Sequence, residues 1–245
     1  QPATVLKGKV NVGKGASTPR KVLVTLQFGF SILLITGTMV IYQQIEHIKR
    51  RNLGYNQENL MVVENTADIE KHFKVMKEEI LGTGVAVAIT KSQAPITSIF
   101  SNNFVDWPGK PEDQKVLFTT LRTEYDFTKT MGIPLLQGRD FSETFKSDTA
   151  AVIMNQTAVN IMGMKDPIGE KVTIWERSFE IIGVTDDVLM GSVFRDVPPM
   201  FMVLMPGAAN YITLRLKATD DLPGAVGRVE TIVNKYSPAY PFEYT

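Results

Sequence analysis

One stretch of the sequence constrains the fold of this chain more than any other, because no residue from Val22 to Tyr42 is charged. As an α-helix these roughly 21 residues would measure about 30 Å, the thickness of a bilayer hydrocarbon core. A buried helix of a soluble protein is usually shorter and keeps a polar side toward solvent. A secretory signal peptide would have a shorter apolar region that ends in small residues at a cleavage site. The run therefore predicts a transmembrane helix, and it includes Val22, Phe28, Gly29, Gly37 and Tyr42.

Basic residues are more frequent before this run than after it. Lys7, Lys9, Lys14, Arg20 and Lys21 precede the run, and Lys49, Arg50 and Arg51 follow it. Because positively charged flanks tend to stay in the cytoplasm, the bias predicts a cytoplasmic N-terminal side. The chain after about Leu53 is then expected outside the cytoplasm. Within the run, Gly29 and Gly37 would allow a neighbouring helix to approach closely.

The helix is expected to continue beyond the apolar run as a stalk. Ile41, Ile45 and Ile48 recur at intervals of four and three residues, which keeps one helix face apolar. We expect these isoleucines to pack against a partner stalk. Asn52, Leu53 and Gly54 supply a stop, since glycine readily takes the left-handed conformation that ends helices.

Length and composition exclude several classes of protein. The 245 residues are enough for a sizeable buried core, so disorder is not expected for most of the chain. The 26 basic and 26 acidic residues give a formal net charge of 0, and no overall field favours binding to nucleic acid. Cysteine is absent, which excludes disulfides, thiol nucleophiles and thiolate metal ligands.

After the stalk, patterns of helix and strand predict an α+β domain with an inserted, strand-rich part. A strand at 59–64, a helix with Ile69, Phe73, Met76 and Ile80 on one face, and a strand at 85–90 form a strand-helix-strand unit. A strand at 211–217 and a helix after Asp220 and Asp221 return to this character at the end of the chain. Between them, shorter strands are predicted at 103–107, 115–122, 151–155, 171–175, 179–184 and 200–205.

No motif in the sequence carries the pattern of a catalytic, cofactor or metal site. Gly8 to Gly15 has the spacing of a phosphate-binding loop, but Gly15 stands where a Ser or Thr would hold magnesium. We interpret it as a basic loop near lipid head groups. His47 and His72 have no metal-ligand spacing to another histidine, and Ser92 and Ser101 have no histidine partner close in sequence.

Two other groups of residues remain open to a functional interpretation. Asp186 and Asp187 follow a predicted strand, where adjacent carboxylates can bind a metal, although they more often belong to a turn. Phe104, Trp107 and Met131 are either core residues or the lining of a groove. The apolar stretch Pro198, Pro199, Met200 and Phe201 is either core or, if exposed, a periplasmic contact surface.

Two sets of segments resemble a known family. The first set is Val5 to Lys9, Arg20 to Phe28, Leu53 to Asn56, and Asn59 with Leu60. The second set is Ala151 to Ala158, Asp166 to Glu170, and Phe179 to Val184. In this order they resemble the permease subunits of FtsX-like and MacB-like ABC transporters, in particular the long permeases of Bacteroidetes type.

The resemblance implies that the chain is the start of the second half of such a permease. It implies a cytoplasmic loop at 1–19, a transmembrane helix and stalk at 20–53, and a periplasmic domain at 54–245. Within the domain, about 54–95 and 208–245 would form a porter-like part and about 96–207 a strand-rich insertion. The implied location is the inner (cytoplasmic) membrane, with the main domain in the periplasm.

The resemblance also implies partners and a function. The partners are an ATP-binding subunit, a second permease copy or half, a periplasmic or outer-membrane protein, and the lipid bilayer. The chain itself would be no enzyme and bind no cofactor; it would couple cytoplasmic ATP hydrolysis to periplasmic change for efflux, lipoprotein transport or envelope regulation. The alternatives are a single-span receptor with an extracytoplasmic ligand-binding domain, and a membrane-tethered enzyme that uses Asp186 and Asp187.

Overall fold

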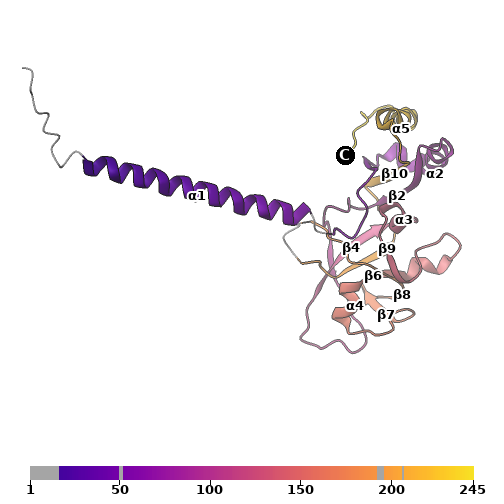
Figure 1. Ribbon diagram of the computed structural model, residues 1–245. Coiled ribbons are helices and arrows are strands. Elements are labelled where there is room, and N and C mark those ends of the chain that lie inside the picture. Colours follow the sequence, from indigo (N-terminus) through magenta and orange to yellow (C-terminus); the bar gives the residue numbers. More distant parts are fainter. Residues whose placement is uncertain (1–16, 50–51, 192–195, 206) are drawn as a thin grey trace, which may run out of the picture. The chain divides into compact units, whose positions relative to one another are not determined.

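The computed structural model describes residues 17–49, 52–191, 196–205 and 207–245 (Figure 1). The chain divides into two compact units, residues 1–51 and residues 52–245. We call the second unit the domain. The basic loop of Gly8 to Gly15 lies outside the described residues.

The described part of the first unit is one unbroken helix, α1, from Ser17 to Lys49 (Figure 1). It contains the whole apolar run and extends it at both ends. Ser31, Thr36 and Thr38 lie within the run, and each hydroxyl donates to a backbone carbonyl one turn earlier. These bonds satisfy the hydroxyls inside the helix, which makes them compatible with lipid. Residues 19–46 are long and apolar enough to cross a membrane.

The domain is built on one mixed sheet of ten strands. Eight strands follow the order β1, β10, β2, β4, β9, β6, β8, β5, while β3 pairs with β4 and β7 pairs with β8. The strands are β1 (Leu60–Glu64), β2 (Ala86–Ser92), β3 (Asn102–Phe104), β4 (Leu117–Thr123), β5 (Leu135–Gly138), β6 (Ala151–Asn155), β7 (Lys171–Ile174), β8 (Arg177–Thr185), β9 (Met200–Leu204) and β10 (Tyr211–Leu216).

The first half of the sheet consists of β1, β10 and β2, all paired antiparallel. The helices α2 (Ala67–Gly82) and α5 (Leu222–Tyr236) pack on one face of it (Figure 1). Ile69, Met76 and Ile80 of α2 are buried, as their spacing predicts. The N-caps are Thr66 and Asp221, whose side chains accept from backbone N–H groups in the first turn.

The second half consists of β4, β9, β6, β8 and β5, and its central strands β9 and β6 are buried on both faces. In β9, Met200, Met202 and Leu204 enter one core, and Phe201 and Val203 enter the other. The short helix α3 (Phe127–Met131) contributes to the first core, and α4 (Gln156–Met162) contributes to the second. A short 3-10 helix, η1, covers Lys146–Ala150. A strand in the middle of a sheet that is covered on both faces is expected to be apolar on both sides. Such strands lack the alternation of apolar and polar residues that half-exposed strands show, as these do.

The two halves meet at a narrow seam. Strands β2 and β4 share a single register pair, Ser92 with Thr123. Two backbone hydrogen bonds flank it, from Gln93 N to Arg122 O (2.9 Å) and from Glu124 N to Lys91 O (2.9 Å). The other neighbouring strands in the sheet order share three to six register pairs each. The sheet is therefore continuous, but β2 and β4 are paired over a much shorter length than the other strands.

The expectation of a contact surface at residues 198–201 was wrong for two of the four residues. Met200 and Phe201 are 1% and 0% exposed because they open β9, which lies between β4 and β6. Pro198 and Pro199 precede the strand and are half-buried. The backbone of both prolines is also used internally, since Pro199 O accepts from Thr119 N and Pro198 O accepts from the Asn155 side chain.

Candidate functional site

The first segment of the domain, which follows α1 in the sequence, is the first candidate for a functional site. We call residues 52–59 the neck segment. Its turns are set locally: the Asn52 side chain accepts from Gly54 N (2.9 Å), and the Asn56 side chain accepts from Glu58 N (2.8 Å). Both are Asx turns, in which a short polar side chain replaces a backbone acceptor. The sequence around Asn52 and Asn56 therefore forces the chain to turn as it enters the domain.

Backbone contacts hold the neck segment against three parts of the domain. Leu53 O accepts from Leu189 N (3.0 Å), just after β8. Asn56 N donates to Met131 O (3.0 Å) at the end of α3, and Asn59 O accepts from Leu216 N (2.8 Å) at the end of β10. The bonds join the neck segment to both halves of the sheet.

Gly54 shows how closely the neck segment approaches the domain. Its φ of +77° lies in the left-handed region, and a Cβ there would be 1.8 Å from the carbonyl oxygen of Asp187. No residue other than glycine fits without moving one of the two backbones. Gly54, which the sequence predicts as part of a helix stop, is therefore a close packing contact within the domain.

Arg215 is the central side chain of this anchor. Its Nε donates to Thr130 O (2.6 Å), and its two terminal nitrogens donate to Glu58 O (2.7 Å) and Asn56 O (2.9 Å). Burial lowers the pKa of Arg215 from its ordinary value, against a smaller opposite effect of the Glu58 charge. The planar guanidinium fits three carbonyls at once because its donors point in fixed directions.

A second polar cluster ties the start of α3 to α2 across the seam. The ammonium of Lys91, which is 4% exposed, lies 2.8 Å from a Glu70 oxygen and 3.3 Å from a Glu124 oxygen. Lys77 pairs with Asp126, the N-cap of α3, at 2.9 Å. Thr90 of β2 donates to Tyr125 O (2.9 Å). The neck segment, Arg215, α3 and α2 thus form one contiguous set of contacts.

The residues predicted to span the membrane all lie in α1. Val22, Phe28 and Tyr42 are 53%, 67% and 64% exposed, and Gly29 and Gly37 have open space beside them. Of the predicted stalk residues, Ile41 and Ile45 are 58% and 45% exposed. Ile48 lies in α1, and its side chain is outside the described part. Exposed apolar side chains of this kind are expected on a helix that meets lipid or other helices.

Asp186 and Asp187 have structural roles. Asp187 accepts from the Thr157 N–H (2.9 Å) and from the Thr157 hydroxyl (2.7 Å) in the first turn of α4, and Asp186 accepts from Asp187 N (2.8 Å). The pair is thus a turn that caps a helix. Within the described residues, no group of three or more acidic or histidine side chains is placed to hold a metal.

The three residues considered as a groove lining do not come together as one. Trp107 and Met131 are buried, at 7% and 1% exposure, in separate cores. Phe104 is 55% exposed and lines an open hollow with Trp107. His72 lies exposed on α2, where its ring is 5.7 Å from that of Tyr236.

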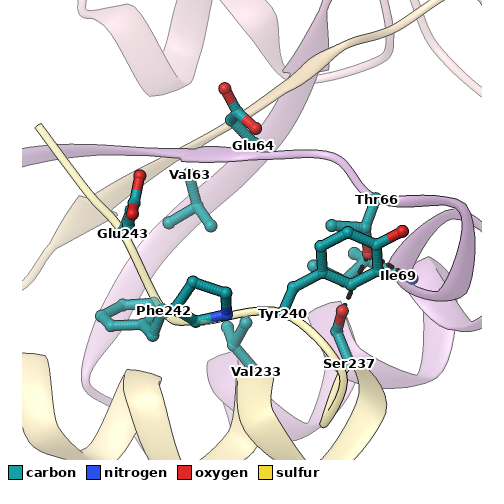
Figure 2. Close-up of a pocket in the computed structure, with 10 residues that line it drawn as sticks. Val63, Glu64, Thr66, Ile69, Val233, Ser237, Tyr240, Phe242 and Glu243 are labelled. Atoms are coloured by element: carbon teal, nitrogen blue, oxygen red, sulfur yellow. Dashed lines mark hydrogen bonds between the residues drawn. The ribbon is translucent and has the colours of Figure 1, made fainter.

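A small cavity lies where the end of α5 meets the start of α2 (Figure 2). Figure 2 shows the hydrogen bond between the hydroxyls of Thr66 and Ser237 (2.9 Å) at one end and Phe242 at the other. Its volume of about 130 Å³ is below the ~300 Å³ at which small-molecule sites begin. It is therefore a packing gap between caps and not a ligand site.

Solved structures with the same fold come from transporter domains. The periplasmic region of MacB from Actinobacillus actinomycetemcomitans aligns with a TM-score of 0.54 and 15% identity, covering 81% of this chain and 93% of that one. The extracellular domain of the noncanonic ABC-type transporter YknZ from Gram-positive bacteria aligns with a TM-score of 0.52 and 13% identity, covering 76% and 98%. A comparison with curated proteins finds no match.

An apolar helix followed by a domain of this fold defines a permease component of an ABC transporter. More particularly, residues 28–232 match the family described as the MacB-like periplasmic core domain, and the chain belongs to that family. The resemblance noted in the sequence is confirmed. Members of this family are components of ABC transporters and work with ATP-binding subunits.

Proposed function

We propose that this chain couples cytoplasmic ATP hydrolysis to a conformational change in a periplasmic domain. One observation carries the proposal: the neck segment is bonded at Leu53, Asn56, Glu58 and Asn59. The neck segment begins a few residues after α1, which is an unbroken helix. Because α1 has no glycine or proline after Thr38, it has no obvious kink site. Displacement of the helix would then displace the neck segment and with it β10, α3 and the loop after β8.

In this proposal residues 1–19 are cytoplasmic, 20–53 cross the inner membrane and form the stalk, and 54–245 lie in the periplasm. Residues 54–95 and 208–245 form a porter-like part, and 96–207 form an insertion. The partners are an ATP-binding subunit, a second permease copy or half, and a periplasmic or outer-membrane protein. The stalk of α1 packs against a partner stalk through Ile41, Ile45 and Ile48. The family favours this function over a single-span receptor, whose gene would encode or adjoin a signalling domain.

The test is an insertion of Gly-Gly between Gln44 and Ile45 in the full-length permease with its ATP-binding subunit. Two residues rotate the helix below the insertion by about 200°, and each glycine costs about 1 kcal/mol of helix stability. We expect ATP-dependent output to fall to a small fraction of the wild-type value at equal expression. The domain should stay folded, because its cores lie beyond the neck segment.

A matched control is the same insertion between Glu112 and Asp113, two exposed residues of a loop in the domain. It should leave output close to wild type, since flexible loops tolerate added length. Undiminished output in the helix variant would overturn the coupling role and leave α1 as an anchor. Equal losses in both variants would mean that the loss is not specific to the helix and would leave the coupling role without support.

A further inference from the structure

The seam between β2 and β4 is held differently on the two faces of the sheet. Arg215 of β10 points away from α2, because it alternates with Leu214 and Leu216 of the core beneath that helix. On this side α3 crosses the seam: Thr130 O accepts from Arg215 in the first half (2.6 Å), and Met131 is buried in a core of the second half. We call it the braced face.

The opposite face of the sheet is covered in two separate parts. The helices α2 and α5 pack on the first half, and α4 packs on the second. Figure 1 shows α4 at the other end of the domain from α2 and α5. We call this side the divided face, because different helices cover it on the two sides of the seam.

A charged link crosses the seam on the divided face. The Lys91 ammonium lies 2.8 Å from a Glu70 oxygen and 3.3 Å from a Glu124 oxygen. Lys91 and Glu70 both belong to the first half, whereas Glu124 directly follows β4 of the second half. Separation of the halves on this face would break the longer contact and leave the shorter one, so Lys91 would keep a carboxylate partner. The ion pair of Lys77 with Asp126 joins α2 to α3 and therefore supports the braced face.

Polar atoms without partners are concentrated at the seam. Among the described residues, five buried side-chain polar atoms have no hydrogen-bond partner, and three of them are Gln93 Oε1, Arg122 Nε and Thr123 Oγ1. Gln93 follows Lys91 by two residues and Arg122 precedes Glu124 by two, so both side chains point to the divided face. A buried polar atom without a partner destabilises the state that buries it, and contact with water removes this cost. Opening the seam on the divided face would hydrate Gln93 and Arg122.

We propose that the seam is a hinge inside the domain. The two halves of the sheet rotate about the braced face and separate on the divided face, which breaks the Lys91–Glu124 ion pair and keeps the Lys91–Glu70 pair. The short pairing of β2 with β4 leaves few backbone bonds to resist this rotation. The proposal goes beyond the coupling function, because it concerns a movement within the domain and does not depend on what α1 does.

Distances between spin labels in the full chain, reconstituted in lipid nanodiscs without nucleotide, test the hinge. The chain has no cysteine of its own, so labels can be placed by pairs of substitutions. Lys74→Cys on α2 with Asn160→Cys on α4 spans the divided face, and all these positions are exposed. We expect double electron–electron resonance to show a main distance and a longer one with about 5% or more of the population. The control pair is Lys74→Cys with Arg228→Cys on α5, within the first half, and it should show a single distance.

Two further substitutions should shift the open population in opposite directions. Glu124→Gln removes the charged link, so the longer distance should gain about fivefold in population. Gln93→Met keeps the length of the side chain but removes the unmet acceptor, so the longer distance should lose population. Glu112→Gln, at an exposed loop position of the second half, is the matched control and should match wild type.

Two results would overturn the hinge. The first is a cross-seam distance as narrow as that of the control pair in both wild type and Glu124→Gln. The second is equal broadening of the two label pairs, which would place the motion in α2 and not at the seam. Because no nucleotide or ATP-binding subunit is present, neither result bears on the coupling proposal, whose test is ATP-dependent output.

Discussion

Lys91 is a buried cation whose surroundings explain how the domain tolerates it. Its ammonium is shared between Glu70 and Glu124 and lies 4.3 Å from the centre of the Phe73 ring. Burial raises the pKa of Glu70, but hydrogen bonds from Lys91 and Asn65 and the Lys91 charge lower it by more, so the net pKa is below its ordinary 4.5. The charges therefore favour the folded state only while Glu70 is ionised.

Replacing Lys91 with methionine is expected to destabilise the domain at pH 7 by about 3 kcal/mol, because it leaves two carboxylates facing each other without a cation. The pH dependence should change as well. A carboxyl whose pKa is lower in the folded than in the unfolded state contributes stability above about pH 4.5, and this contribution is lost as pH falls through the folded-state pKa. The measurement is urea unfolding of wild type and variant at pH 7 and pH 3, followed by Trp fluorescence. The free energy of unfolding should fall less between pH 7 and pH 3 in the variant than in wild type.

Lys71→Met is the control for this prediction. Lys71 and Asp68 form an ion pair whose side chains are 69% and 43% exposed, and such surface pairs contribute about 1 kcal/mol or less. In Lys71→Met, the fall in the free energy of unfolding between pH 7 and pH 3 should match that of wild type. Equal stability of Lys91→Met and wild type at pH 7 would mean that solvent reaches this cluster.

Arg215 is a residue of the candidate site that sequence analysis missed. The strand at 211–217 was predicted from its apolar residues, and those residues, Ile212, Leu214 and Leu216, do fill the core between the first half of the sheet and the helices α2 and α5. The alternation along the strand could have indicated that Arg215 faces away from the apolar core, because Tyr211, Thr213 and Arg215 share the opposite face. The sequence does not show which groups Arg215 binds, because the three carbonyls that accept its hydrogen bonds lie 85, 157 and 159 residues away in sequence.

At the scale of elements, segments with an apolar pattern were predicted and those without one were missed. The helices α1, α2 and α5 and the strands β1 and β10 show helical or alternating patterns, β6 is a short continuous apolar run, and all six lie close to their predicted positions. The helices α3 and α4 have five and seven residues, too few for a periodic signal. Strand β5 is largely exposed and so has no apolar pattern.

The neck segment is an element whose attachment can be loosened without unfolding the domain. Arg215→Met keeps the aliphatic stem but removes the donors to Thr130, Glu58 and Asn56. We expect amide hydrogen exchange in residues 53–59 to accelerate by about ten- to a hundredfold, as for loss of about 1.5–3 kcal/mol of local stability. Exchange in β6 and β9 should stay near wild type, since these strands lie in the other half of the sheet.

Arg228→Met is the matched control, because Arg228 is exposed on α5. Its exchange pattern should equal that of wild type throughout. If residues 53–59 exchange no faster in Arg215→Met, the backbone bonds to Leu189, Met131 and Leu216 suffice, and the arginine is not the anchor.

For the molecule as a whole, the position of the domain relative to the membrane is testable. Five basic residues precede the apolar run and three follow it, so the N-terminal side should stay in the cytoplasm. Protease added to spheroplasts that express the full chain should digest the region after Leu53 and spare a tag placed before Arg20. Lysed spheroplasts, in which both sites are accessible, are the control. The opposite protection pattern would reverse the assigned inside and outside.

The narrow seam also bears on how this architecture can change over time. The chain leaves the first half of the sheet after Ser92 and returns at Asn210, and these two positions are hydrogen-bonded neighbours, with Asn210 N 3.0 Å from Ser92 O. A segment whose two ends meet can be lengthened, shortened or exchanged at little entropic cost to the remainder. This segment can therefore change in length or sequence while the first half of the sheet keeps its plan, provided that the new segment still covers the sheet face on which α3 packs.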